Sequence, residues 1–468
     1  MYQVPHYIDN NKVFIVQRSE IEGRLEPEFY RPSIADLEKI IRGKSSHKLR
    51  DYALSVSGGA TPKKTKGDKY YADKETGVPF LRVQNLNTDG TLSLDDCLYI
   101  NKDTHEGMLQ RSQVAEGDLL VKITGVGRMA VASVAPEGFI GNTNQHMVVV
   151  KTGNKEISKY LARYLNLDII EKIASRHSTG GTRPALDYPS VKNLPIIKGI
   201  DFSPIDRAIE IKKQKESEAQ QLLDSIDAYI LNELGITLPE IKTDLKSRVF
   251  LVNRSELEER LDPTVYKDGT KLTSSLFENV KLSNVAFVNP GGSYKGKAIA
   301  TSISFIPMEV IDEVYSEISS QGETTIADST GFTKFKEGDL LWAKITPCMQ
   351  NGKSAIARDL TNGLGCGSTE FFVLRPKDER LSVEYLHVIL HLKCVRETAM
   401  LYFGGSAGQQ RVSASFLENF NLPLPSFTKQ QEIANHIYAI RQQAKQLQEE
   451  GKSILENAKK EVEQMIIG

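Results

Sequence analysis

The sequence feature that most constrains the fold is a long amphipathic stretch at residues 203–235, near the middle of the chain. Its apolar residues recur in alternating steps of four and three, with Lys212 and Glu216 as the polar positions on the same line, which predicts a helix with a coiled-coil type of contact face. The apolar positions are Ile205, Ile209, Ala219, Leu223, Ile226 and Ile230. Pro204 and Gly235 are typical of the start and end of a helix. Such a helix of ~32 residues is roughly 48 Å long, and its single apolar face requires a partner.

A second stretch with the same period, residues 427–467, provides that partner. Gly451 and Glu461 interrupt its line of alternating four- and three-residue steps. The apolar positions on the line are Ile433, Ile437, Ile440, Ala444, Leu447, Ile454, Ala458 and Met465. Because each helix follows a globular stretch, we predict an intramolecular antiparallel pair of coiled-coil helices that separates two domains.

The bulk composition describes a soluble protein with more than one domain. A chain of 468 residues exceeds one ordinary core, and 40% apolar with 25% charged residues is typical of globular proteins. No apolar run approaches the ~18 residues of a membrane span, and the first residues lack the layout of a signal peptide, so we expect a cytoplasmic location. Four scattered cysteines indicate neither a disulfide framework nor a zinc site. A net charge of −1 argues mildly against nucleic-acid binding but does not exclude it, because local basic faces can bind DNA.

The chain contains an internal repeat. Residues 13–30 and 249–266 are identical at 11 of 18 positions. Two shorter similarities follow in the same order: EGDLLVKIT with EGDLLWAKIT, and NLPII with NLPLP. The regions between them differ, which suggests either two domains that read different things or ordinary duplication with divergence.

The pattern predicts an α+β fold with two pseudo-repeated domains built on small sheets. Short apolar runs at 77–83, 118–124, 146–152 and 371–376 predict strands. Helical stretches at 157–176 and 382–402 are each followed by a glycine-rich polar loop. The predicted parts are a first domain at 1–202, a helix at 203–236, a second domain at 237–426 and a helix at 427–468.

Several of these segments resemble the DNA-specificity subunit of type I restriction–modification systems. The resemblance is most specific at residues 331–357 and 363–376, with the words GDLL, AKITPC, NGK and GSTEF. SGGATPKK, VPFLRVQNL and GNTNQHMVVV resemble a differently branched version of the same domain, and NLPLPSFTKQQEIANHI resembles the family's transition into a conserved helix. The first transition, NLPIIKGIDFSPIDRAI, departs from the usual Pro- and Gln-rich form.

The resemblance implies a subunit without catalysis of its own. Its two target-recognition domains would each read one half of an interrupted, asymmetric site in double-stranded DNA. The helices would space the domains and dock two methyltransferase subunits, and restriction (motor) subunits would join that core. S-adenosylmethionine, ATP and Mg²⁺ would be bound by those partners, and this chain would bind no cofactor or metal.

Contacts with bases and phosphates require polar and basic side chains on loops. In the first domain the candidates are Lys63, Lys64, Lys66, Lys69, Arg82, Asn85, Arg128, Arg176, Thr179 and Arg183. In the second they are Lys295, Lys297, Lys344, Gln350, Asn351, Lys353, Gln409, Gln410 and Arg411. The residues expected to hold the helix pair and dock partners are Ile209, Leu223, Ile226, Ile230, Ile433, Ile437, Ile440, Leu447 and Ile454.

For several residues the sequence leaves two interpretations open. The lysines at 63–69 suit either a solvated face or a DNA contact, and residues 142–146 suit either base reading or a polar turn before a strand. His387 and His391 have a helical spacing but no HExxH pattern, so a metal role is not supported. Trp342 is interpreted as a core residue.

Three alternatives to a type I specificity subunit remain at this stage. One is the recognition part of a related type IIB- or IIG-like or other DNA-modification system. Another is an enzyme fused to recognition domains, against which the missing NPP[YF] and Walker sequences count. The third is a duplicated carbohydrate- or protein-binding module.

Overall fold

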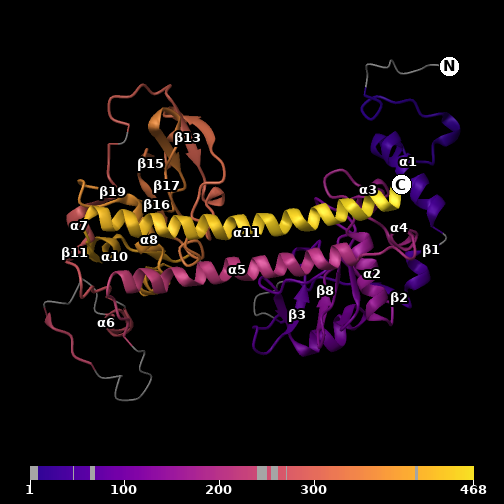
Figure 1. Ribbon diagram of the computed structural model, residues 1–468, viewed down its shortest axis with the longest axis horizontal. Helices are drawn as coiled ribbons and strands as arrows, with labels where there is room; N and C mark the ends of the chain where they lie inside the picture. The colour runs from indigo at the N-terminus through magenta and orange to yellow at the C-terminus, as the bar shows by residue number, and fades with distance from the viewer. Residues whose placement is uncertain are drawn as a thin grey trace. The chain divides into compact units, whose positions relative to one another are not determined.

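The computed structural model describes residues 9–45, 47–63, 69–239, 250–254, 262–269, 271–292, 294–405 and 409–468. Part of the second repeat element, residues 249 and 255–261, lies outside these residues. Contacts divide the chain into two units. Unit 1 comprises residues 1–214 and 450–468, and unit 2 comprises residues 215–449. Each unit is described by itself, and Figure 1 labels its helices and strands.

Unit 1 contains two four-stranded sheets and a two-stranded one. The first sheet has the order β2 (Ser55–Gly58), β9 (Met147–Lys151), β6 (Leu119–Lys122), β7 (Ala132–Val134) and is antiparallel throughout. The second has the order β4 (Leu98–Ile100), β3 (Val78–Leu81), β8 (Ile140–Thr143), β5 (Gln113–Ala115), with β3 and β8 parallel. The small sheet pairs β1 (His47–Lys48) with β10 (Pro195–Ile196). The short helices are α1 (Pro32–Lys44), α2 (Lys155–Leu165), α3 (Asp168–Arg176) and α4 (Tyr188–Lys192).

Unit 2 repeats this strand order. Its first sheet is β12 (Ala286–Val288), β19 (Phe371–Pro376), β16 (Leu340–Ala343), β17 (Ser354–Ile356), again antiparallel. Its second is β14 (Gly322–Thr325), β13 (Ser302–Ile306), β18 (Leu364–Gly367), β15 (Thr333–Lys336), again with one parallel pair, β13 and β18. Two-stranded sheets pair β11 (Asn279–Lys281) with β22 (Asn421–Pro423) and β20 (Phe403–Gly404) with β21 (Arg411–Val412). The short helices are α6 (Pro263–Asp268), α7 (Leu282–Val285), α8 (Val383–His391), α9 (Lys393–Met400) and α10 (Ala414–Asn419).

The central sheet of each unit is buried on both faces, which explains its continuous apolar strands. In β6, Leu119 and Val121 pack among the helices, whereas Leu120 between them packs against the second sheet. In β16, Leu340 and Trp342 likewise face the helices, and the side chain between them faces the second sheet. Successive residues of a strand point to opposite faces, so each unit has three layers: helices, central sheet and second sheet. The predicted mixed α and β structure with small sheets is confirmed in both units.

The strands predicted from apolar runs are present as β3, β6, β9 and β19. The predicted helical stretches at 157–176 and 382–402 are each broken into two helices, α2 with α3 and α8 with α9. Trp342 is 1% exposed, and its ring stacks on Phe372 and Phe416 at centroid distances of 6.3 Å, so its prediction as a core residue is confirmed.

Two long helices are present where the heptad pattern predicts them: α5 (Ser203–Glu233) and α11 (Phe427–Ile467). The division into units assigns the first residues of α5 and the last residues of α11 to unit 1, and the remainder of each helix to unit 2. This division differs from the four parts predicted from sequence, which stay a prediction.

Within each unit the two long helices touch each other. In unit 2, Lys429 of α11 forms an ion pair of 2.6 Å with Glu233 of α5, and the rings of His436 and Tyr229 lie 4.2 Å apart. Residue numbers therefore rise along α11 as they fall along α5, which is an antiparallel arrangement. In unit 1, Gly451 of α11 lies so close to α5 that an added Cβ would be 3.3 Å from the Cα of Lys212. The glycine that interrupts the apolar line thus permits close packing of the two backbones.

The predicted contact positions of α11 are buried from Ile433 to Ala444, and Ile454 and Ala458 are half-buried against the core of unit 1, whereas Met465 near the end is exposed. Ile433, Ile437 and Ile440 are buried as predicted. Beyond Gly451, however, Glu461 and Met465 are exposed, and the buried positions are Leu455, Lys459, Val462, Glu463 and Ile466. A straight α-helix has 3.6 residues per turn and drifts by about 20° per heptad, so the buried line moves by one position over several heptads.

Candidate nucleic-acid interface

In unit 1, three segments that are distant in sequence meet at the end of β6. The backbone N–H of Ile123 donates to the carbonyl oxygen of His146 at 2.9 Å, which joins the strand end to the turn between β8 and β9. Gly125 donates to Pro184 at 3.0 Å, which joins the same strand end to the glycine-rich loop at 178–185. That loop is closed by Thr179 and Ala185, whose backbones exchange two hydrogen bonds of 2.8 Å. We call this meeting point of three loops the unit 1 junction.

Unit 2 contains an equivalent arrangement at the end of β16, the unit 2 junction. Lys344 donates its backbone N–H to the carbonyl oxygen of Glu370 at 2.9 Å, and Thr346 donates to Gln410 at 3.0 Å. Val412 returns a hydrogen bond of 2.9 Å to the carbonyl oxygen of Lys344. The strand end, the turn before β19 and the second glycine-rich loop therefore meet as in unit 1.

Strand pairing fixes which positions of the two junctions correspond. Leu119 pairs with Val150 in unit 1, and Leu340 pairs with Leu374 in unit 2. Counting along the strands from these pairs makes Ile123 equivalent to Lys344, His146 to Glu370 and, across the glycine loop, Ala185 to Arg411. The backbone arrangement is therefore the same, whereas the side chains differ in charge and hydrogen-bonding capacity.

Lys122 of EGDLLVKIT and Lys344 of EGDLLWAKIT are not at structurally equivalent positions, although both precede Ile-Thr in the sequence. Unit 2 has one extra residue, Ala343, before its lysine. A shift of one residue along a strand turns a side chain to the opposite face. Lys122 is therefore buried, its ammonium group donates to the carbonyl oxygen of Val126 at 2.7 Å, and burial lowers its pKa. Lys344 instead lies half-buried with its ammonium group 5.6 Å from the centre of the Phe372 ring.

A groove beside the unit 2 junction is basic and partly aromatic. Its volume is about 560 Å³, and its charged lining residues are Lys295, Lys334 and Lys344. The ammonium group of Lys334 lies 5.1 Å from the centre of the Tyr294 ring. None of the described residues that line the groove is acidic. Such a groove suits a phosphodiester chain, because lysines attract phosphates while rings and glycines leave flat, accessible surface. Sequence reasoning identified Lys295 and Lys344 but missed Lys334.

Beside the unit 1 junction, polar side chains from two of its loops and from the loop after β2 lie at the surface. Thr61, Gln145 and Arg183 are exposed, and the Thr61 hydroxyl donates to the Gln145 side-chain oxygen. The Nε2 atoms of Gln145 and His146 are 3.4 Å apart. Partial burial and the nearby charge of Arg183 lower the pKa of His146, which keeps its ring neutral. Lys63 is also exposed.

The polar residues at 142–146 lie in different environments, and any contact of theirs with bases stays a prediction. Asn142 is fully buried and its amide donates to the carbonyl oxygen of Leu109 at 2.8 Å. Asn144 is 7% exposed, and its side chain accepts the backbone N–H of His146 at 3.0 Å. Asn142 therefore joins β8 to residue 109, Asn144 supports the turn, and Gln145 is the exposed amide.

Several predicted DNA ligands have partners within the chain. Arg176 donates to Glu38 at 2.5 Å and lies over the Phe29 ring, and Arg128 forms an ion pair with Asp168. The others with such contacts are Arg82 (to the carbonyl of Asp96, 2.6 Å), Asn85 (buried, to the carbonyl of Ser93, 2.9 Å), Gln350 (to the sulfur of Met400, 3.3 Å), Asn351 (to Glu313, 3.1 Å), Lys353 (to the carbonyl of Met308, 3.3 Å) and Arg411 (to Glu370, 2.7 Å). Their roles toward DNA stay predictions, and these contacts indicate that each also has a structural role.

The remaining predicted ligands lie mostly at the surface. Those with exposed side chains are Lys63, Lys69, Thr179, Arg183, Lys295, Lys297 and Gln409, and Gln410 is half-buried. Lys64 and Lys66 lie outside the described residues.

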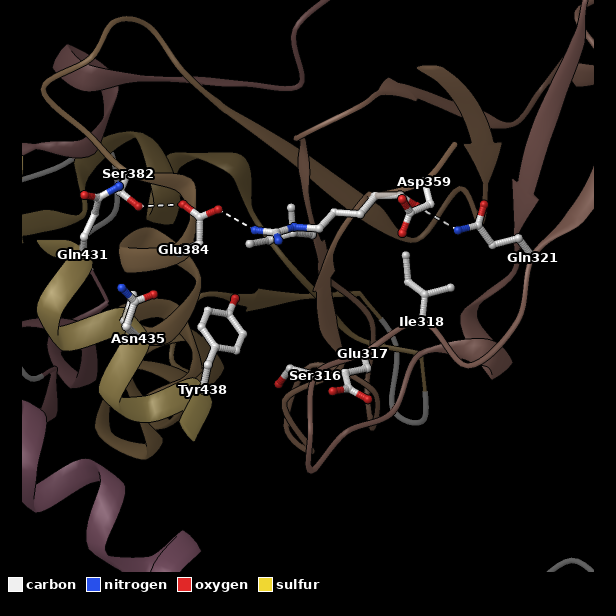
Figure 2. Close-up of a pocket in the computed structure, with 13 residues that line it drawn as sticks. Ser316, Glu317, Ile318, Gln321, Asp359, Ser382, Glu384, Gln431, Asn435 and Tyr438 are labelled. Atoms are coloured by element: carbon white, nitrogen blue, oxygen red, sulfur yellow. Dashed lines mark hydrogen bonds and ion pairs between the residues drawn. The ribbon is translucent and has the colours of Figure 1, made fainter. Parts of the chain in front are cut away.

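A different cavity in unit 2, of about 580 Å³, lies between α11, the start of α8 and the loop at 316–321 (Figure 2). Its charged groups are largely paired with each other or with neighbours. Arg358 pairs with Glu384, and Glu317 accepts from Lys445 at 2.7 Å. With three carboxylates and a single arginine among its lining residues, this cavity is a poor site for a nucleic acid.

The histidines that sequence analysis set aside as metal ligands have other partners. His387 contacts Ser354 at 3.2 Å and Tyr438 at 3.1 Å, and burial lowers its pKa to about 3. His391 contacts the carbonyl oxygen of Glu313 at 3.2 Å. Across the described ranges, no three His, Cys, Asp or Glu side chains gather in a way that could hold a metal ion.

The predicted helix-pair residues lie at or near the helix contacts. Ile209, Ile226, Ile230, Ile433, Ile437 and Ile440 are buried, and Leu223, Leu447 and Ile454 are half-buried. None of the helices in the described part of the chain combines the length and apolar character needed to cross a membrane.

Part of the chain matches a known protein family. Residues 275–456 match the model of the type I restriction modification DNA specificity domain. The matched residues make up less than half of the 468-residue chain and lie mostly in unit 2. The chain is 37% identical over 164 residues to the EcoEI type I restriction enzyme specificity subunit of Escherichia coli. The alignment covers 34% of this chain and 26% of that protein. The chain is 30% identical over 216 residues to the type I restriction enzyme EcoAI specificity subunit of the same organism. This alignment covers 45% of this chain and 34% of that protein. The matches thus span about a quarter to a third of these two relatives.

Among solved structures, this chain is similar to one from work on complex assembly and conformational transition of the type I R-M system. The identity is 16% and the TM-score 0.45, with 90% of this chain and 95% of that chain covered. It is also similar to the HsdS subunit of Thermoanaerobacter tengcongensis, with 14% identity, a TM-score of 0.32, and coverage of 90% of this chain and 94% of that chain.

Proposed function

We propose that this chain is the DNA-specificity subunit of a type I restriction–modification complex, and that it recognises an asymmetric, interrupted site in double-stranded DNA. The observation that carries the proposal is the pair of junctions. The same three loops meet in each unit, but equivalent positions hold Ile123 and Lys344, or His146 and Glu370. A repeated scaffold that presents unlike side chains is what reading two different half-sites requires.

The surfaces beside the junctions have the chemistry of DNA contacts. Phosphate contacts need basic groups and position the protein without specifying sequence, as Lys295, Lys334 and Lys344 would do along the unit 2 groove. Base contacts need amides, guanidinium groups or carboxylates that reach the groove edges. Gln145 in unit 1 and Gln409 in unit 2 are exposed amides on junction loops.

The long helices would set the spacing between the half-sites. Their contacts within each unit, antiparallel in unit 2, support a coiled-coil pair that acts as the spacer and docks the partner subunits. A 31-residue α5 corresponds to roughly 46 Å. Half-sites read from one face of B-DNA are about 34 Å apart per helical turn, or a multiple of this distance. The proposed partners are two methyltransferase subunits and the restriction subunits.

In this proposal the chain itself is not catalytic, and catalysis takes place in the partner subunits. S-adenosylmethionine for methyl transfer, and ATP with Mg²⁺ for the restriction subunit, would be bound there. The modified base, expected to be adenine, would be swung out of the duplex by a methyltransferase subunit.

The test is co-expression of this chain with the methyltransferase subunit encoded beside it, followed by genome-wide mapping of modified bases. A two-part motif with unlike halves and a fixed unread spacer supports the proposal. Retention of the purified complex on duplex DNA should also weaken steeply as salt rises, because phosphate contacts release counterions. Absence of both modification and salt-dependent DNA retention would refute it, and methylation by the purified chain alone would refute the non-catalytic role.

A further inference from the structure

Gln145 is the exposed amide at the tip of the turn between β8 and β9. Asn142 and Asn144 are buried and used within the chain, as described above. Gln145 is not needed for the backbone hydrogen bonds that join the three loops. The equivalent position in unit 2, counted from the paired strands, is Thr369, so the two units present different groups at this point. The exposed Gln145 side chain beside the junction is therefore accessible to a ligand.

The Gln145 amide is held in one orientation. Its side-chain oxygen accepts from Thr61, which comes from the loop after β2, and its nitrogen faces the neutral His146 ring at 3.4 Å. A side-chain amide oxygen has two lone pairs and the nitrogen has two hydrogens. One acceptor position and one N–H therefore remain available, side by side, for a ligand. A fixed amide loses less side-chain entropy on binding than a free one.

We propose that Gln145 is a base-reading residue of unit 1 that recognises an adenine in the major groove. The free acceptor and the free N–H match the N6 amino group and the N7 acceptor of adenine, which is the pairing that glutamine makes with this base. The inference rests on the proposed DNA-specificity function. Arg183 and Lys63, both exposed beside the junction, would contact the flanking phosphates and align the turn with the groove.

Thr61 acts as a positioning residue in this proposal, because it orients the amide without contacting the base. Replacing Thr61 with Val removes the hydroxyl donor and leaves Gln145 free to rotate. We therefore expect Thr61→Val to weaken discrimination at the same base pair as Gln145→Ala, and to a smaller extent.

The experiment uses the complex of the full chain with its methyltransferase subunits and maps modified sites for the wild type, Gln145→Ala and Thr61→Val. The matched control is Gln110→Ala, which removes another exposed glutamine of unit 1. We expect Gln145→Ala to relax the motif at one A·T pair in one half-site, with discrimination at that pair falling roughly 5- to 150-fold. The other half-site, the spacer and the melting temperature should stay unchanged, and Gln110→Ala should modify the wild-type motif.

Three results would overturn the inference. They are an unchanged motif for Gln145→Ala, relaxation at a G·C pair, and relaxation in both half-sites. Each of these leaves the proposed function intact, because the wild-type complex still modifies a two-part site. A wild-type complex that modifies no site would instead refute the proposed function itself, so the two failures are distinguishable.

Discussion

Glu38 on α1 joins that helix to the end of α3 in unit 1, so its replacement should destabilise the unit strongly. Its carboxylate accepts from Arg176 at 2.5 Å and from His177 at 2.8 Å, both at the end of α3, and from Arg42 at 2.7 Å. The side chain of Glu38 is only 4% exposed. Glu38→Gln keeps the shape but removes the charge, which leaves these cationic partners without a buried counterion.

The pKa of Glu38 gives the size of the effect. Burial opposes its charge, but hydrogen bonds and charges from His177, Arg176 and Arg42 outweigh burial and lower the pKa from 4.5 to about 2. That difference corresponds to roughly 3 kcal/mol of stability at pH 7, at about 1.4 kcal/mol per pH unit. Because the folded-state pKa is the lower one, this stability is present above pH 4.5. It is lost as the pH falls toward 2, and a little under half remains near pH 3.

Thermal unfolding followed by circular dichroism measures this loss. At about 2–4 °C per kcal/mol for 150–250 residues, Glu38→Gln should lower the melting temperature of unit 1 by roughly 6–12 °C at pH 7. The difference from wild type should be smaller near pH 3. Trp342, the single tryptophan, lies in unit 2, so its fluorescence transition should not move.

The matched control is Glu28→Gln, which breaks the exposed ion pair with Arg31 and should change stability by less than about 1 kcal/mol. A melting temperature for Glu38→Gln within 2 °C or so of wild type at pH 7 would show that this carboxylate does not hold α1 to α3.

Further predictions concern DNA binding and assembly. Arg183→Gln should weaken DNA binding and reduce the slope of the logarithm of the binding constant against the logarithm of the salt concentration by about one. Arg176→Gln should lower the stability of the protein and leave this slope unchanged. Equal slopes for both variants would contradict a DNA contact by Arg183 alone of the two. Lys344→Met should reduce the salt dependence of DNA binding in the same assay, while Lys122→Met should not, because its ammonium group is buried. Ile437→Asp places a charge at a fully buried position, so size-exclusion chromatography should show loss of the methyltransferase partner, and an unchanged complex would contradict the docking role. Insertion of one helical turn into both α5 and α11 should lengthen the unread DNA spacer in methylation maps, and an unchanged spacer would count against the helices as spacers.

The long helices could be predicted from sequence because their apolar period is repeated over many turns. The deeper burial of Leu455 and Val462 than of the heptad positions beside them could not be predicted, because the pattern alone does not show whether the helix supercoils. Strand positions followed from short apolar runs. The parallel pairing of β3 with β8 had no local signal, because pairing partners are set by contacts between distant segments.

The site was predictable as a set of loops but not as a set of contacts. The glycine-rich loops and the strands of EGDLLVKIT and EGDLLWAKIT occur in both halves of the sequence. The structure joins loop and strand by hydrogen bonds in both units. Arg128 and Arg176 were indistinguishable in sequence from exposed cations, because their partners Asp168 and Glu38 lie 40 and 138 residues away. The difference between Lys122 and Lys344 depends on a single extra residue, whose effect becomes clear only from strand register.

Unit 1 is built from two separate segments of the chain, and this affects the order in which the two units can fold during synthesis. Residues 450–468 supply Val462 and Ile466 to its core, and the carboxylate of Glu463 accepts the backbone N–H groups of Asp168 and Ile169 at the start of α3. The ribosome makes these residues only after the whole of unit 2. Residues 1–214 therefore cannot complete their core until unit 2 has been synthesised, and part of their apolar surface stays exposed during that time. Unit 2 can fold before unit 1. A chaperone that binds the growing polypeptide would be expected to protect residues 1–214 longer than residues 215–449.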